Sequence, residues 1–137
     1  MTVRSFHFRR NQRGFTLVEL MIVIFIMLIL MSIAAPMYSQ SVVRAKESAL
    51  RQDLYHLRQG IDQYTMDKQK APQSLDDLVS AGYFRQLPLD PFTRSTSTWV
   101  VVNEDVLSSI DQTEPGITDV HSGSELTSSE GTPYSEW

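Results

Sequence analysis

The sequence predicts an α+β fold, in which one long N-terminal helix precedes a small region of short strands and loops. Residues 15–37 form an almost unbroken apolar run, and apolar residues then recur every three or four positions. Further along, short runs of β-branched residues alternate with turn-forming residues. At 137 residues, the chain has room for one small domain and an anchor.

The first helix begins in the apolar run, which predicts a transmembrane segment. Its 23 residues include Thr16, Glu19 and Ser32 as polar side chains. A helix of this length spans about 34 Å, enough to cross the roughly 30 Å hydrocarbon core of a bilayer. The run is also longer than the apolar region of an ordinary secretory signal.

The charge distribution predicts the orientation of this helix. Residues 1–14 hold four arginines and no acid, whereas the rest of the chain has eight Lys or Arg against sixteen Asp or Glu. A basic flank resists translocation, so the N-terminus is expected in the cytoplasm. The acidic remainder also argues against nucleic acid as a partner, because phosphate binding needs a basic surface.

Beyond the apolar run, the pattern predicts an amphipathic second half of the same helix, ending near residue 70 because Pro72 follows. The apolar stripe consists of Val43, Leu50, Leu54, Leu57, Ile61 and Tyr64. The charged residues between them are expected on a solvated face; they are Arg44, Lys46, Glu47, Arg51, Asp53, Arg58 and Asp62.

Short elements follow the long helix. Ser74 is a good N-cap with acids after it, and it predicts a short helix that ends at Gly82. Residues 83–94 contain two prolines and are expected to form a loop. Residues 98–103 and 117–121 are expected to be strands.

The segment Arg13-Gly14-Phe15-Thr16-Leu17-Val18-Glu19-Leu20 carries the most specific signal. A charged residue near the centre of a membrane helix costs about 2.5–3.5 kcal/mol, and less near the interface. Glu19 therefore either reaches the headgroups or has a partner. Cleavage between Gly14 and Phe15 would create an α-amino group that could neutralise Glu19 on the same or a neighbouring subunit.

The sequence RGFTLVELMIVI resembles the processing site of type IV pilins and of the pseudopilins of type II secretion. The resemblance implies that a prepilin peptidase cuts after Gly14 and that Phe15 is N-methylated. Pro36 matches the family's proline. It further implies a cleaved leader at 1–14, a transmembrane and assembly helix at 15–37, and a periplasmic pilin-like domain at 38–137. In that domain the helix packs on a small antiparallel sheet with a C-terminal loop.

Later residues favour the pseudopilin branch. Asp90-Pro91-Phe92 and the tail SGSELTSSEGTPYSEW are similar to the corresponding regions of the major pseudopilin. Many pilus-forming pilins close their C-terminal region with a disulfide, which a chain without cysteine cannot form. A major or minor pilin of a type IV pilus, acting in adhesion, motility or DNA uptake, is the alternative. Residues 102–117 depart from the major-pseudopilin pattern, so the sequence does not decide between a major and a minor subunit.

The resemblance implies a structural role rather than an enzymatic one. The subunit would wait in the bacterial inner membrane, join a helical homopolymer with minor pseudopilins at an inner-membrane assembly platform, and drive protein export. No pair among the three histidines has the spacing of a metal site, and no catalytic triad can be argued from spacing. A membrane-anchored protein that binds a ligand without polymerising is the competing class.

The resemblance also implies that the C-terminal loop binds Ca²⁺, which takes six to eight oxygen ligands. The candidate ligands are Ser122, Ser124, Glu125, Ser129 and Glu130. The family's sites favour Asp, whereas this segment has Glu at both acidic positions, so a solvated acidic loop is an equal alternative.

Overall fold

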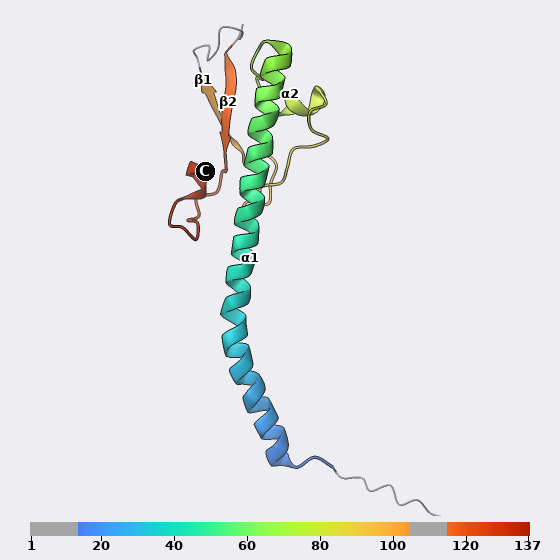
Figure 1. Ribbon diagram of the computed structural model, residues 1–137, viewed down its shortest axis with the longest axis vertical. Coiled ribbons are helices and arrows are strands. Elements are labelled where there is room, and N and C mark those ends of the chain that lie inside the picture. The colour runs from blue at the N-terminus through green and yellow to red at the C-terminus, as the bar shows by residue number, and fades with distance from the viewer. Residues whose placement is uncertain (1–13, 105–114) are drawn as a thin grey trace, which may run out of the picture. The chain divides into compact units, whose positions relative to one another are not determined.

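A computed structural model of the protein describes residues 14–104 and 115–137. Its elements are helix α1 (Leu17–Lys68), helix α2 (Leu75–Ser80), strands β1 (Val100–Glu104) and β2 (Gly116–His121), and the 3-10 turn η1 (Tyr134–Glu136) (Figure 1). The expected pilin-like α+β arrangement of one long helix and a small antiparallel sheet is confirmed. The chain divides into two compact units between Ser39 and Gln40, and α1 contributes to both.

The first unit holds the apolar part of α1. An 18-residue window of this helix has a mean hydropathy of 2.9, and none of it is buried. Within this part of the helix, the Ser32 hydroxyl donates a hydrogen bond to the backbone carbonyl of Ile29 at 2.7 Å. Pro36 lies inside the helix. By length and composition, α1 can therefore cross a membrane.

The second unit is built on the apolar stripe of α1. Leu50, Leu54, Leu57 and Ile61 are buried, as the spacing predicts. They form one core with Leu75 and Leu78 of α2, Ile117 and Val120 of β2, and with Trp99 and Tyr134.

Two residues of α1 differ from the expectation. Val43 is 39% exposed, and Glu47, expected on the solvated face, is buried with 7% exposure. Glu47 lies three residues before Leu50 and four after Val43, so it occupies a position of the stripe itself. Its carboxylate is buried because hydrogen-bond donors from Ser129 and Tyr134, near the C-terminal end of the chain, surround it.

The ends of both helices follow local backbone chemistry. α1 ends at Lys68, two residues before the expected end, because Gln69 adopts a left-handed conformation with φ of 56°. Ser74 caps α2, and its amide donates to the carboxylate of Asp77 at 2.9 Å. Gly82 has φ of 87°, which explains why glycine stands where α2 ends.

The sheet has two antiparallel strands, as expected. Val101 pairs with Val120, and the register shifts between Val102 and Asn103. β1 begins two residues later than the sequence predicts, and β2 one residue earlier. Figure 1 shows the two strands along one side of the C-terminal half of α1.

The loop after α2 is tied to the chain that follows β2. Asp90 is fully buried, and its Oδ1 accepts the amides of Phe92 and Thr93 at 2.8 and 3.2 Å. Its Oδ2 accepts the hydroxyl of Ser122 at 2.6 Å. The ring of Phe92 stacks on Tyr134, with centroids 3.9 Å apart. The Asp-Pro-Phe segment therefore fixes where the C-terminal segment begins and where it packs.

Candidate functional site

The predicted processing site lies immediately before α1. Gly14 and Phe15 precede the helix, and the Phe15 side chain is 86% exposed. A Cβ added to Gly14 meets no atom within 4 Å. Packing in the described part of the chain therefore does not require glycine at this position, so any such requirement comes from a molecule that acts on the chain.

Thr16 is the residue that starts α1. The amide of Glu19 donates to the Thr16 hydroxyl at 3.2 Å, and the amide of Leu20 donates to the Thr16 carbonyl at 3.2 Å. Thr16 and Glu19 have the Thr-x-x-Glu spacing of a capping box, and an acid in the first turn suits the helix dipole. Thr16 is therefore the N-cap residue of α1, a role that the Thr-x-x-Glu spacing indicates but that was not among the sequence-based predictions.

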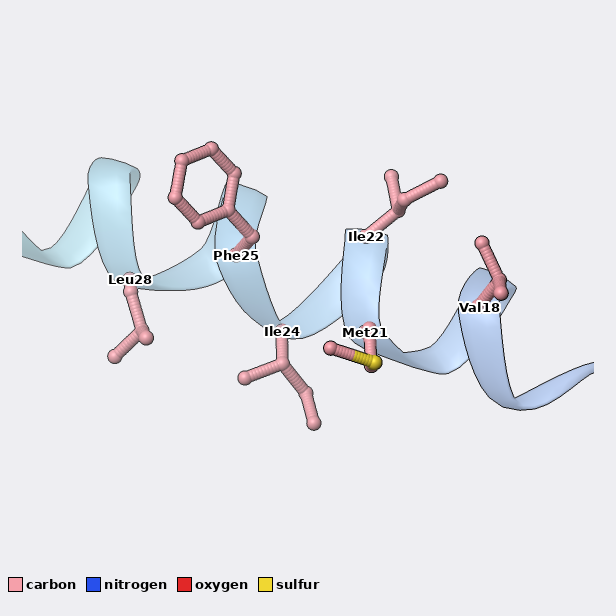
Figure 2. Close-up of a pocket in the computed structure, with 6 residues that line it drawn as sticks. All are labelled: Val18, Met21, Ile22, Ile24, Phe25 and Leu28. Atoms are coloured by element: carbon pink, nitrogen blue, oxygen red, sulfur yellow. The ribbon is translucent and has the colours of Figure 1, made fainter.

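An apolar surface lies around and beyond Glu19 on α1. The side chains of Val18, Met21, Ile22, Ile24, Phe25 and Leu28 border an open hollow. In Figure 2, Val18, Ile22 and Phe25 project above the helix, and Ile24 and Leu28 project below it. The helix therefore offers apolar contacts in several directions, which suits packing against lipid and against more than one neighbouring helix.

Four of the five candidate calcium ligands have partners elsewhere in the protein. Ser122 donates to Asp90, and the Ser124 hydroxyl accepts the amide of Leu126 at 3.3 Å. Glu130 forms an ion pair with Arg51 at 2.9 Å, and Ser129 contacts Glu47. Glu125 is exposed. Within residues 14–104 and 115–137, no three His, Cys, Asp or Glu side chains are grouped so that they could hold a metal ion.

The buried carboxylate of Glu47 receives three hydrogen bonds from the C-terminal segment, residues 122–137. Oε1 accepts the Ser129 amide at 2.6 Å and the Tyr134 hydroxyl at 2.9 Å, and Oε2 accepts the Ser129 hydroxyl at 2.7 Å. The Ser129 hydroxyl and amide lower the pKa of Glu47 below its ordinary 4.5. Burial and the contact with Glu47 raise the pKa of Tyr134 to about 12.

Two arginines of α1 hold the same segment. The guanidinium carbon of Arg51 lies 4.3 Å from the centroid of the Trp137 ring. Arg58 donates to Asp119 at 2.6 Å and to the carbonyl oxygens of Val120 and Trp137 at 3.0 and 2.9 Å. Burial raises the pKa of Asp119, but the hydrogen bond and charge of Arg58, the Val120 amide and His121 together lower it, so the pKa lies below its ordinary value. We call Glu47, Arg51 and Arg58 the C-terminal clamp.

Sequence reasoning did not identify the clamp. It placed all three residues on the solvated face, although Glu47 interrupts an apolar stripe and so carried a detectable signal. The partners of Arg51 and Arg58 lie far along the chain, at Glu130, Asp119 and Trp137, and no local pattern marks such pairs.

Comparisons with known proteins agree on one family. Residues 9–35 match the family model described as the prokaryotic N-terminal methylation motif. The chain is 35% identical to type II secretion system core protein G of Klebsiella pneumoniae over 99 residues, which is 61% of this chain and 71% of that protein. Identity to the same-named protein of Escherichia coli (strain K12) is 32% over 109 residues, covering 68% of this chain and 73% of the other. No solved structure gives a significant match.

Proposed function

Since this chain belongs to the family of the type II secretion system core protein G, we propose that it acts through a processed N-terminus and a helix-packed filament to push folded cargo out of the cell. Its role as a structural subunit of a pseudopilus follows from the family. Identity to these relatives over most of their length is the observation that carries this function. The apolar helix and the family fit a protein anchored in the inner membrane.

Processing is the first step of the proposal. A prepilin peptidase cuts between Gly14 and Phe15 and methylates the new N-terminus. The methylation-motif match over residues 9–35 and the unpacked Gly14 support this step. Before assembly, the subunit crosses the inner membrane once, with the leader in the cytoplasm and residues 38–137 in the periplasm, as the basic flank predicts.

Assembly is the second step. Subunits leave the membrane at an inner-membrane platform and join a helical filament with copies of themselves and with minor pseudopilins. Inside the filament, protein contacts replace lipid contacts, so the gain comes from close packing and polar pairing rather than from hydrophobic burial. The charge of Glu19 pairs with the α-amino group of Phe15 on a neighbour, because an unpaired buried charge costs several kcal/mol.

The pairing of Glu19 is tested by co-expression with the assembly machinery. Glu19→Ala removes the charge that needs a partner, so the subunit should insert and be cleaved but should not enter filaments. Glu19→Gln should be intermediate or defective. Ser32→Ala is the matched control, because the Ser32 hydroxyl is satisfied within its own helix. Gel mobility reports cleavage, and shearing with microscopy reports filaments. A wild-type filament yield from Glu19→Ala would show that Glu19 only reaches the headgroups.

The type IV pilus alternative makes a different genetic prediction. Deletion of a pseudopilin gene abolishes secretion, whereas deletion of a pilin gene abolishes twitching or pilus display while secretion continues. A membrane protein that binds a ligand without polymerising would need neither cleavage at Gly14 nor association through Glu19.

Calcium binding by residues 122–130 stays a prediction from the resemblance. It requires Glu130 to exchange Arg51 for the ion, because the two are paired. A ligand that binds only the folded form raises the melting temperature. If calcium binds there, millimolar calcium should raise the melting temperature of the protein, and Glu130→Ala should remove that rise. An unchanged melting temperature would favour the solvated loop.

A further inference from the structure

The buried carboxylate of Glu47 needs an explanation, because it replaces an apolar residue in the core-facing stripe of α1. Leu50, Leu54 and Leu57 continue the same stripe and are buried without any polar partner. A carboxylate at such a position is costly unless hydrogen bonds or a cation compensate it. An apolar side chain would fill the position without this cost, so the carboxylate has another role.

All three hydrogen-bond donors to Glu47 come from one short part of the chain. Ser129 supplies its amide and its hydroxyl, and Tyr134 supplies its phenolic hydroxyl. Both carboxylate oxygens are used, and hydrogen bonds to an ionised acceptor are roughly twice as strong as neutral ones. The segment therefore turns donors toward Glu47, which is the arrangement that binds an anion and the opposite of the oxygen-lined arrangement that binds a cation.

The C-terminal segment has little regular structure of its own. After β2, its backbone hydrogen bonds include those of an isolated bridge between Thr127 and Pro133, of the turn at residues 128–132 and of the short turn η1. The Ser128 hydroxyl accepts the amides of Glu130 and Thr132, each at 3.2 Å, and so shapes the turn that presents the Ser129 amide. The segment is therefore also held by side chains outside it, from α1 and from the Asp-Pro-Phe segment.

We propose that the Glu47 carboxylate is the anchoring site of the C-terminal segment, and that it holds this segment on α1 without a bound cation. Arg51 and Arg58 flank the anchor and hold Glu130 and the Trp137 carbonyl. Glu47 is a positioning residue: it shapes the periplasmic surface that the subunit brings to its neighbours.

Hydrogen exchange on the full-length protein in detergent tests the anchor, with and without millimolar EDTA. In wild type, peptides covering residues 126–137 should be equally protected in both conditions. Glu47→Gln should raise the exchange rate of these peptides about tenfold or more, because charge-assisted hydrogen bonds are lost. Tyr134→Phe keeps the ring in the core and should give a smaller rise in the same peptides. The matched control is Asp62→Asn, the same change at an exposed site of α1.

Two results would overturn the proposal. Wild-type protection of residues 126–137 in Glu47→Gln with EDTA would mean that the carboxylate does not hold the segment. Loss of protection in wild type with EDTA, restored by calcium, would mean that a cation holds it. If Glu47→Gln does not accumulate, Tyr134→Phe decides, because unchanged exchange in that variant also contradicts the anchor.

Discussion

Two glutamates that interrupt apolar patterns have different surroundings. Glu47 receives three hydrogen bonds from its own chain. Glu19 is exposed, and within the described residues its backbone amide donates to the Thr16 hydroxyl, whereas the structure records no hydrogen bond to its carboxylate. A buried charge must be paired. The subunit therefore satisfies Glu47 alone, whereas Glu19 needs a partner once it leaves the interface, which agrees with a role in assembly.

The lowered pKa of Glu47 predicts acid sensitivity of the C-terminal segment. The folded pKa lies below the ordinary 4.5, so ionised Glu47 stabilises the fold above about pH 4.5, and this stability is lost as the pH falls through the folded pKa. The groups that face Glu47 are Arg51, Ser129 and Tyr134. Asp119 also titrates in this pH range.

The acid sensitivity is therefore measured as the difference in melting temperature between wild type and Glu47→Gln. Melting temperatures of wild type and Glu47→Gln are compared from about pH 7 to about pH 3. The gap between them should be largest at neutral pH and should shrink as the pH falls, while the contribution of Asp119 cancels. A gap that is independent of pH would show that ionisation of Glu47 does not stabilise the fold.

The second prediction at the scale of single residues concerns substitutions of Gly14. Because a Cβ there meets no atom within 4 Å, Gly14→Ala and Gly14→Leu should leave the fold of the chain unchanged. Gly14→Leu should nevertheless block processing, since a peptidase that needs an unobstructed backbone cannot accept the side chain. Mass spectrometry should find wild type starting at methylated Phe15 and Gly14→Leu retaining the leader. A cleaved Gly14→Leu protein would contradict the assignment of this site.

At the scale of elements, the two parts of α1 have different surfaces. Its first part exposes apolar side chains, as lipid and neighbouring helices require. Its second part buries one narrow stripe and uses polar side chains to hold distant segments. Gly60 is buried beside the stripe, and a Cβ at this position would collide with the ring of Phe84. The glycine is therefore required by close packing between α1 and the loop after α2.

This contact predicts that Gly60→Ala changes the free energy of unfolding in opposite directions with and without the Phe84 ring. Alanine is about 1 kcal/mol better than glycine inside a helix. Overpacking costs about 1–3 kcal/mol, so Gly60→Ala should lower the free energy of unfolding in wild type. In a Phe84→Ala background the obstacle is gone, and the same substitution should raise it. Urea unfolding of the four proteins measures both effects. An equal effect of Gly60→Ala in both backgrounds would contradict the steric explanation.

At the scale of the whole molecule, the two units carry different parts of the function. The core residues all lie between Leu50 and Tyr134, within the unit that begins at Gln40. The membrane-crossing surface and the residues around the processing site lie in the other unit. Folding of the unit that begins at Gln40 and membrane insertion of the apolar part of α1 should therefore be separable.

Removal of residues 1–39 tests this separation. The remaining chain should be soluble and should unfold cooperatively, because it keeps the whole core and the C-terminal clamp. It should not bind membranes or enter filaments. Near-UV circular dichroism with a thermal melt measures the fold, and full-length protein in detergent is the reference. A shortened chain without a cooperative transition would mean that the first unit contributes to folding of the second.

The sequence by itself determined the features that depend on neighbouring residues. The apolar run, the stripe at Leu50, Leu54 and Leu57, the cap at Ser74 and both strands follow from periodicity and local backbone chemistry, and the structure confirms them. The segment around Gly14 and Glu19 also indicated the family, because the residues of this motif are contiguous in the sequence.

Only the tertiary structure decided how the C-terminal segment is held. Glu47 is separated from Ser129 and Tyr134 by 82 and 87 positions, and Arg58 is separated from Trp137 by 79. Periodicity within α1 gives the face on which a side chain lies, but it does not give what covers that face. Whether a charged residue is solvated or buried depends on the donors that folding brings to it from elsewhere in the chain, and these donors turn Glu47 from an apparent surface residue into an anchor.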